Sequence, residues 1–512
     1  MSATGIAVLC VLAMGCAQSL ERTMWSADDQ PPEQTDTVLK AHLKNGDVYV
    51  FDHWQFHNQT RRIGGMGFHY DMNRTLKEKG MLSVSIDDVA LFESNKPVKS
   101  PFIAALALIT AGSIAMTVVC LTNPKTCFGS CPTFYVPGAN GPILAAEAFS
   151  DAVAPSLAKR DLDALFHAQL KSSDLVMRVT NEALETHVID RTNLLAATRP
   201  HGGRVLATSD GRLLKAVAFE EPQQCRADEG DCRDTMGKSD GSERWSLTEA
   251  TDLATKETID LEFAPSPDDS MPYGFLVEAR QTFVTTFLMY QALAYLGSRT
   301  GPMLAALSST TNGPPEALAG IGKLFEMLGG IELLVEDGRG GWQPVGRFNE
   351  TGPIASDVQL IEVPKGLSAR RLRLRITKGY YRIDRIARVR IAGPATVTQV
   401  PLAAIVTKHG DAAGAQAWLA GKAPQLVTQP GDDHALHFRL PDNYGDLDLF
   451  LDSHGYYIEW MRSEWLKEEN FPRFLQMVSF PSQALRNLAP AFKRVEPGFE
   501  DAFWKSRYVK TP

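Results

Sequence analysis

The segment SPFIAALALITAGSIAMTVVCLTNPKTCFGSC, residues 100–131, decides how the rest of the chain is arranged relative to a membrane. It has no charged residue between Lys99 and Lys125, and its apolar part, residues 102–121, reaches the ~20 residues that a helix needs to cross a bilayer. It can be a transmembrane helix, for which the basic residues before it favour a cytoplasmic N-terminal side. Alternatively, residues 100–122 form a hydrophobic helix that packs in protein or dips into the membrane, because its many small residues suit close helix contacts. Both interpretations place residues 127–512 outside the cytoplasm.

The N-terminal residues 1–16, MSATGIAVLCVLAMGC, resemble a bacterial lipoprotein signal in which the processed chain begins at a lipid-modified Cys16. The positively charged region that usually precedes the apolar run of a signal is absent, so a plain secretory signal or an apolar buried segment stays open. Ala17 follows the cysteine, which favours the outer membrane by resemblance to enterobacterial sorting rules. The polar residues 17–37 are expected to form a flexible tether.

The remaining cysteines indicate an oxidising compartment. The close pairs Cys127/Cys131 and Cys225/Cys232 predict two local disulfides. Cys120 lies within the apolar run and is expected to be a buried thiol. A zinc site is disfavoured, because the paired C-x-x-C spacing is missing.

The other segments predict an α+β fold that is mostly β. Short alternating runs separated by Gly-containing turns predict a small barrel or meander over residues 38–98, and similar runs predict β-sandwich-like regions at 127–275 and 329–455. Residues 276–328 are expected to form a helical insert, with the clearest helix in FLVEARQTFVTTFLMYQALAYLG, residues 275–297, and further helices at 302–308 and 315–328. In the second region, DDHALHFRLP and LDLFLDSHG are expected to form a hairpin around residues 443–445.

The last segment, residues 456–512, predicts a C-terminal helical arm. Its first helix is expected in YYIEWMRSEWLKEEN, and short helices are expected at 482–488 and 497–505. Trp460, Trp465 and Trp504 are expected to hold this arm on the body of the protein.

Several motifs together carry a resemblance to a known family. They include CFGSCPTFY at 127–135, GYYRID at 379–384 and GYYIEWMRSEWLKEE at 455–469. Over roughly residues 40–505 the chain resembles a family of uncharacterised bacterial envelope lipoproteins. The resemblance implies a location and an architecture, and no established activity comes with it.

Two groups of residues are candidates for binding. Trp342, Tyr380 and Tyr381 could stack on a sugar ring, with Arg382 and Asp384 for its hydroxyls. The alternative is that these aromatic residues belong to the core and that the arginines of this region, including Arg371, Arg373 and Arg375, pair with acidic residues.

The second group is the acidic loop between Cys225 and Cys232. Asp228, Glu229, Asp231 and the nearby Asp234 supply the oxygen ligands that calcium prefers. Their spacing departs from the EF-hand loop, so an ordinary polar surface loop is the alternative. No other cofactor or metal is predicted.

The net charge of −8 and the pI near 5.8 argue against a nucleic-acid partner, because phosphate binding needs a basic face. The chain contains no G-x-S-x-G, H-E-x-x-H, P-loop or Rossmann fingerprint. The sequence therefore predicts a non-enzymatic scaffold or partner-binding lipoprotein of the cell envelope, in the outer membrane and facing the periplasm or the surface. Its expected contacts are the membrane, through the lipid and residues 102–121, and a protein or glycan. A glycan- or ligand-binding surface protein and an unrecognised enzyme are the alternatives.

Overall fold

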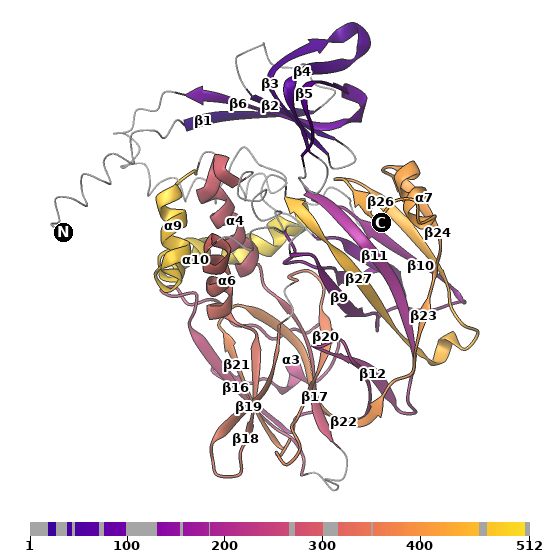
Figure 1. Cartoon of the computed structure of the whole chain (residues 1–512). Helices are drawn as coiled ribbons and strands as arrows, with labels where there is room; N and C mark the ends of the chain where they lie inside the picture. Colours follow the sequence, from indigo (N-terminus) through magenta and orange to yellow (C-terminus); the bar gives the residue numbers. More distant parts are fainter. Residues whose placement is uncertain are drawn as a thin grey trace, which may run out of the picture. The chain divides into compact units, whose positions relative to one another are not determined.

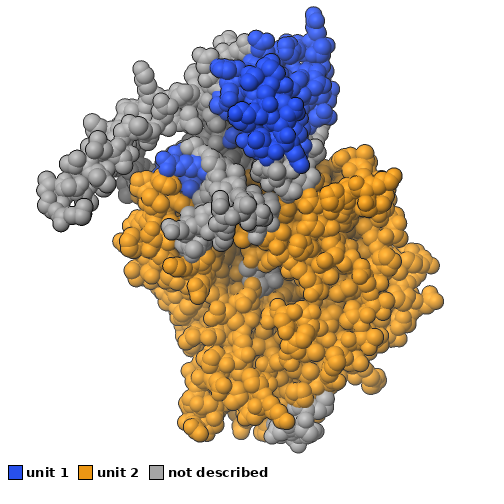
Figure 2. Space-filling model, in the orientation of Figure 1, with its two compact units in different colours: residues 1–116, 294–305, 461–470 blue, residues 117–293, 306–460, 471–512 orange. Residues whose placement is uncertain are grey.

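A computed structural model describes residues 19–26, 38–43, 47–70, 76–98, 131–153, 157–183, 185–265, 272–300, 316–349, 352–459 and 468–506. The chain divides into two compact units: residues 1–116, 294–305 and 461–470 form the first, and the rest forms the second (Figure 2). The predicted fold class, α+β and mostly β, is confirmed. Cys16, Cys127 and the predicted hydrophobic helix 100–122 lie outside the described residues. Within the described ranges, no helix is long and apolar enough to span a membrane.

The first unit contains a six-stranded antiparallel sheet with the order β1-β6-β2-β3-β4-β5 (Figure 1). Its strands are β1 Ser19–Ser26, β2 Val38–Leu43, β3 Val48–His57, β4 Arg62–Tyr70, β5 Leu76–Ser85 and β6 Val89–Val98, with short 3₁₀ turns at Asn58–Thr60 and Ile86–Asp88. Alternate residues of each strand point to one face. On this face Leu39, Phe51, Ile63 and Phe92 form a buried core.

The prediction of a flexible tether over residues 17–37 is wrong where strand β1 forms. Residues 19–26 do not form a flexible segment, because they pair with β6 from Ser19–Val98 to Ser26–Leu91. This pairing gives hydrogen-bond partners to the backbone N–H and C=O groups of the segment. The polar composition of the segment does not indicate a strand. Residues 17, 18 and 27–37 lie outside the described residues.

The described residues of the second unit form four sheets, and the strands of each sheet come from distant parts of the chain. The first has the order β24-β26-β10-β7-β8. Its strands are β7 Thr133–Gly138, β8 Gly141–Glu147, β10 Asp174–Thr180, β24 Leu402–His409 and β26 Asp433–Arg439. The second has the order β23-β11-β27-β9, and β25 pairs with β11 beside this path. Its strands are β9 Lys159–Ala164, β11 Glu185–Thr198, β23 Val397–Val400, β25 Leu426–Thr428 and β27 Leu447–Glu459.

The third sheet closes into a barrel with the order β12-β13-β22-β17-β20. Its strands are β12 Gly203–Thr208, β13 Leu213–Glu220, β17 Tyr273–Gln281, β20 Asp357–Glu362 and β22 Tyr381–Pro394. Leu206, Leu276, Leu360 and Val389 belong to its buried core. The fourth sheet has the order β15-β14-β16-β21-β18-β19. Its strands are β14 Gln224–Ala227, β15 Gly230–Asp231, β16 Lys256–Glu262, β18 Ile331–Glu336, β19 Trp342–Phe348 and β21 Arg371–Thr377.

This interleaving corrects the predicted division into sandwich-like regions at 127–275 and 329–455. Each of the four sheets takes strands from both regions; β10 pairs with β26, for example, and β16 pairs with β21. The predicted hairpin around 443–445 is also wrong, because β26 and β27 belong to different sheets. Alternation along a strand defines its two faces but does not identify its partner.

The described helices are α3 Arg233–Met236, α4 Val284–Leu296, α6 Glu316–Leu328, α7 Ala412–Leu419, α9 Phe471–Ser479 and α10 Pro481–Ser506, with 3₁₀ turns at Gly297–Arg299 and Tyr444–Asp446. Helices α6, α9 and α10 pack against one another (Figure 1). The residues predicted as a helix at 302–308 lie outside the described part of the chain. The helix predicted at 315–328 corresponds to α6. The helix predicted at 275–297 is correct only in its second part, α4, because residues 275–281 belong to strand β17 and pair with β22.

The C-terminal arm differs from the prediction in two places. Residues 456–459 continue strand β27, because this strand pairs with β11 as far as Glu185–Glu459. The two short helices expected near the C-terminus are one helix, α10, which continues through Pro490 and Pro497. Its buried residues Leu485, Leu488 and Phe492 supply the apolar face that tertiary packing needs.

Candidate binding pocket

The aromatic residues proposed from the sequence as a sugar platform do not form one site. Tyr380 and Tyr381 are only 3% and 2% exposed, and their rings meet edge to face with centroids 5.0 Å apart. Trp342 begins β19, at the edge of a different sheet from Tyr381. Buried rings cannot stack on a ligand, so the tyrosines belong to the core. Arg382 is the member of this predicted group that lines a pocket, described below.

The basic face of β21 is occupied by ion pairs. Arg371 pairs with Glu336 at 3.0 Å and Arg373 with Asp260 at 2.6 Å, and Arg375 donates to Glu332. Arg373 also lies over the ring of Trp342, 4.2 Å from its centroid. These arginines therefore pair with the acidic residues of neighbouring strands, as the alternative interpretation expected.

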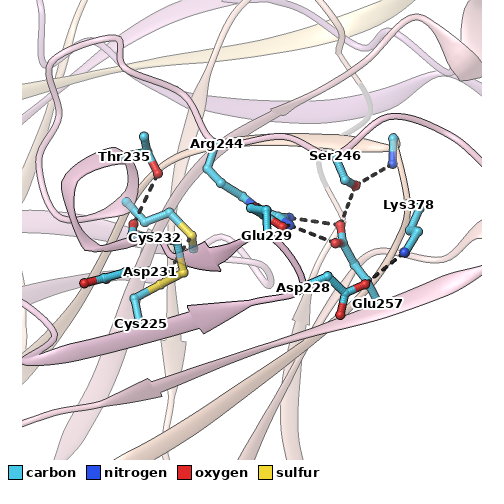
Figure 3. Close-up of polar contacts among 12 residues, drawn as sticks. Cys225, Asp228, Glu229, Asp231, Cys232, Thr235, Arg244, Ser246, Glu257 and Lys378 are labelled. Atoms are coloured by element: carbon cyan, nitrogen blue, oxygen red, sulfur yellow. Dashed lines mark hydrogen bonds and ion pairs between the residues drawn. A yellow bond between two sulfur atoms is a disulfide. The ribbon is translucent and has the colours of Figure 1, made fainter.

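The acidic loop is stapled by the predicted disulfide between Cys225 and Cys232, whose Cα atoms are 5.1 Å apart. Its carboxylates point to separate cations, as Figure 3 shows for two of them: Asp228 pairs with Lys378 at 2.8 Å and Glu229 with Arg244 at 2.7 Å. Asp231 pairs with Arg233 at 2.7 Å. Calcium needs several oxygens that converge on one point. The predicted calcium site is not formed, and the described residues contain no cluster suited to a metal.

The state of Cys131 does not agree with the second predicted disulfide, between Cys127 and Cys131. It carries a free and buried thiol, which contradicts the expected bond to Cys127. Burial, with the nearby carboxylates of Glu147, Glu185 and Glu459, raises the pKa of this thiol well above its ordinary value. A buried thiol with a raised pKa is a poor nucleophile, so Cys131 is not a candidate catalytic residue.

The second unit contains a pocket of about 450 Å³, within the range of small-molecule sites. One side is the segment 245–247, another is the C-terminal half of α10, and its remaining residues come from the start of α4 and from around the start of β22. The lining residues are Trp245, Ser246, Leu247, Thr282, Phe283, Gly379, Arg382, Phe492, Glu496, Pro497, Phe499, Glu500, Asp501 and Trp504. We call this site the Trp245 pocket.

Four charged groups form a connected network at the Trp245 pocket, and two of them, Arg382 and Glu500, line it. Arg280 donates to both carboxylate oxygens of Glu243, at 2.6 and 2.7 Å, and to Glu500 at 3.0 Å. Arg382 pairs with the second oxygen of Glu500 and lies 3.6 Å from Glu243. Each guanidinium is thereby shared between two carboxylates, so the four groups are fixed and their charges balance.

Trp245 is the most exposed aromatic side chain of this pocket. The guanidinium of Arg382 lies 3.9 Å from its ring centroid, which is the geometry of a cation–π contact. The indole nevertheless remains 46% exposed. Trp504 of α10 is 36% exposed and lines the same pocket. Trp504, which was expected to help hold the arm on the body, is thus partly exposed at this pocket, and Trp460 and Trp465 lie outside the described residues.

The segment that carries Trp245 is fixed on both sides (Figure 3). Arg244 is 4% exposed and donates two hydrogen bonds to Glu257, at 2.8 and 2.9 Å, and two to Glu229. The hydroxyl of Ser246 donates to Glu257 at 2.6 Å and accepts from the backbone N–H of Gly379 at 3.0 Å. The disulfide loop thus supplies Glu229 to the network that positions the tryptophan.

Helix α10 holds the other end of the same segment. The backbone N–H of Thr248 donates to Glu496 at 2.7 Å, and Lys493 donates to the backbone oxygen of Thr248 at 2.7 Å. Lys493 also pairs with Glu496 at 2.9 Å. The pocket walls are therefore joined by hydrogen bonds on either side of Trp245.

We expect Gly379→Ala to lower the free energy of unfolding by about 3 kcal/mol, because two costs add at this position. Gly379 has a left-handed φ of +72°, and a Cβ there would collide with the Thr248 side chain and lie 2.6 Å from its backbone nitrogen. Gly366→Ala is the matched control: its φ is +92°, but no atom lies within 4 Å of the new Cβ. The control should cost only about 1 kcal/mol. Urea denaturation followed by circular dichroism checks both values, and equal losses would contradict the steric part.

Sequence reasoning missed Trp245 and did not assign Trp504 to a pocket. The first lies in the polar stretch DGSERWSLTEA, residues 240–250, where no periodicity marks it as part of a site. The available signal was a single large aromatic residue within a charged loop. No protein-family model matches the chain, and the chain has no similar protein among curated sequences or solved structures. Its function is therefore inferred from the pocket and from the sequence.

Proposed function

We propose that the chain is a membrane-anchored lipoprotein of the bacterial cell envelope that binds a ligand through the Trp245 pocket without catalysing a reaction. The observation that carries the binding function is a half-exposed indole held in place by a guanidinium that is itself fixed by two carboxylates. Rigid aromatic groups of this kind bind ligands with little loss of conformational entropy. The envelope location is supported by the signal-like residues 1–16 and agrees with the disulfide between Cys225 and Cys232.

Binding is favoured over catalysis by the state of the carboxylates in the pocket. Glu500 pairs with Arg280 and Arg382, and Glu496 accepts from Thr248 and pairs with Lys493. Hydrolysis of a glycosidic bond, for example, canonically uses two carboxylates that both face the substrate. Asp501 is the remaining carboxylate of the pocket lining, and a single such group does not make a catalytic pair.

The proposed anchor would hold the first unit close to the membrane. Only Ala17 and Gln18 separate Cys16 from the first residue of β1. A fully extended chain covers about 3.5 Å per residue, so a lipid on Cys16 would keep the start of β1 within about 10 Å of the bilayer surface. Residues 102–121 would add a second contact with the membrane. We place the protein in the outer membrane, facing the periplasm or the surface.

We expect Cys16→Ser to abolish incorporation of radioactive palmitate and to release the protein from the membrane fraction. The thioether-linked lipid needs the cysteine sulfur, and serine has none. Cys10→Ser is the matched control, because Cys10 lies within the segment that processing removes. It should leave both labelling and fractionation unchanged. Palmitate label on Cys16→Ser, or a wild-type protein without label, would overturn the lipoprotein proposal.

A further inference from the structure

We infer that the Trp245 pocket binds a neutral or amino-bearing saccharide, with one sugar ring stacked on the indole of Trp245. This inference rests on the proposed binding function and names its ligand class. It differs from the platform expected from the sequence, because Trp342, Tyr380 and Tyr381 are not part of the pocket lining.

The indole supplies the platform. Arg382 covers one face of the ring at 3.9 Å from the centroid, and 46% of the side chain remains exposed. The face of the ring opposite Arg382 is flat and apolar, whereas the ring nitrogen is polar. A pyranose ring has the matching shape, since its axial C–H groups form an apolar face and its hydroxyls project from the edge.

The rim supplies hydrogen-bonding groups for those hydroxyls. Asp501 is exposed, and its side chain has no hydrogen bond or ion pair in the part of the chain that the structure describes. Its carboxylate can accept two hydrogen bonds from adjacent hydroxyls. Arg382 complements this acceptor, because its guanidinium carries only hydrogen-bond donors. Two of these donors already face Glu243 and Glu500.

The charge balance of the pocket excludes an anionic ligand. Arg382 is balanced by Glu500 and Glu243, and Lys493 by Glu496. Asp501 then leaves the lining with an excess of negative charge. A phosphate, sulfate or uronate would need an unpaired cation. A neutral saccharide or one that carries an amino group meets no such penalty.

The test is a titration of the detergent-solubilised full-length protein, followed by isothermal calorimetry and by tryptophan fluorescence. The probes are a maltotriose, a trisaccharide of N-acetylglucosamine, a trisaccharide of glucosamine, and a polyuronate trisaccharide as the anionic probe. We expect saturable binding of at least one of the first three and none of the polyuronate. Trp245→Ala should weaken this binding at least tenfold, and Trp245→Phe, which keeps a flat ring, should weaken it less.

Trp342→Ala is the matched control, because Trp342 also carries an arginine over its ring but lies outside the pocket. It should bind as the wild type does, and thermal melts of all three variants show that they are folded. Absence of binding to all three non-anionic probes, or unchanged binding by Trp245→Ala, would overturn the saccharide inference. Neither result touches the palmitate experiment, so failure of the inference is distinguishable from failure of the proposed anchor. A peptide that binds in place of the saccharides and loses affinity in Trp245→Ala would overturn the inference and leave the binding function standing.

Discussion

Replacing Arg244 by methionine should lower the free energy of unfolding by about 3–5 kcal/mol, the range found when one partner of a buried ion pair is removed. Arg244 is almost fully buried, and so is Glu257, to which it donates two hydrogen bonds. Burial alone would lower the pKa of Arg244, but its hydrogen bonds to Glu257 and Glu229 raise it, so the guanidinium stays charged. Methionine keeps much of the side-chain volume and leaves the carboxylate of Glu257 without its cation.

Two further variants separate this cost from a general loss of packing. Arg244→Met combined with Glu257→Met removes both charges and should recover most of the lost stability, because buried pairs can often be replaced by apolar residues. Arg371→Met breaks the exposed pair with Glu336 and should change stability by less than about 1 kcal/mol. Urea denaturation measures all three, and an Arg244→Met loss no larger than that of Arg371→Met would contradict the assignment.

The same substitution should also weaken the ligand site. Arg244 precedes Trp245, and its backbone forms two hydrogen bonds with Ile383, at 2.8 and 2.9 Å. Loss of the side-chain bonds to Glu257 and Glu229 leaves this residue held by its backbone bonds to β22. Preorganisation of the indole then falls even in molecules that remain folded.

The sequence predicted many of the strands because alternation is a local property. Strand β17 was predicted as a helix, because its residues 274–281 are all buried and show no alternation. The pattern of β21, RLRLRIT, places Leu372 and Leu374 in the core and the arginines between them outside. The fold class follows from such segments. The close cysteine pair Cys225/Cys232 is also local, and its disulfide was predictable.

The pairing of the strands was not predictable, because it depends on contacts between residues that are far apart in the sequence. Strands β10 and β26 are joined by the ion pair between Arg178 and Asp433, which are 255 residues apart in the sequence. Nothing within either strand identifies the other. The predicted boundaries between sandwich-like regions failed because the chain crosses between sheets where composition does not change.

The pocket depends on even more distant contacts. Trp245 becomes a platform only because Arg382 and Glu500 approach it from β22 and α10. Arg382 was predicted from the sequence as a binding residue, but together with Tyr380 and Tyr381. Those two tyrosines are buried in the structure. A residue adjacent in sequence to a functional group can point to the other side of a strand.

Glu147→Gln is expected to change the pH dependence of stability. Burial raises the pKa of Glu147 from 4.5 to about 8 in the folded protein. Its side chain is 4% exposed, and one carboxylate oxygen accepts the backbone N–H of Ile354 at 2.8 Å. A raised folded-state pKa means that the folded protein binds a proton which the unfolded chain releases. The contribution of this group is therefore fully present below pH 4.5 and is lost as pH rises through about 8.

The size of this loss follows from the shift in the pKa. Each unit corresponds to about 1.4 kcal/mol, so the wild type should lose roughly 4 kcal/mol at this site between pH 4.5 and pH 8. Glutamine retains an oxygen that accepts from Ile354 and cannot ionise. The variant should match the wild type within about 1 kcal/mol at pH 4.5 and exceed its stability by several kcal/mol at pH 8.

Urea unfolding of both proteins at half-unit steps from pH 4.5 to pH 8.5 measures this difference directly. Other groups shift with pH as well: burial raises the pKa of Asp357 to about 7 and that of Asp432 to about 6. These groups are the same in the two proteins, so the difference between the curves isolates Glu147. A constant difference across the whole range would show that Glu147 is ionised in the folded protein, and the carboxylate would then need a cation close to it. Arg280, whose charge lowers the pKa of Glu147, is the residue to replace next in that case.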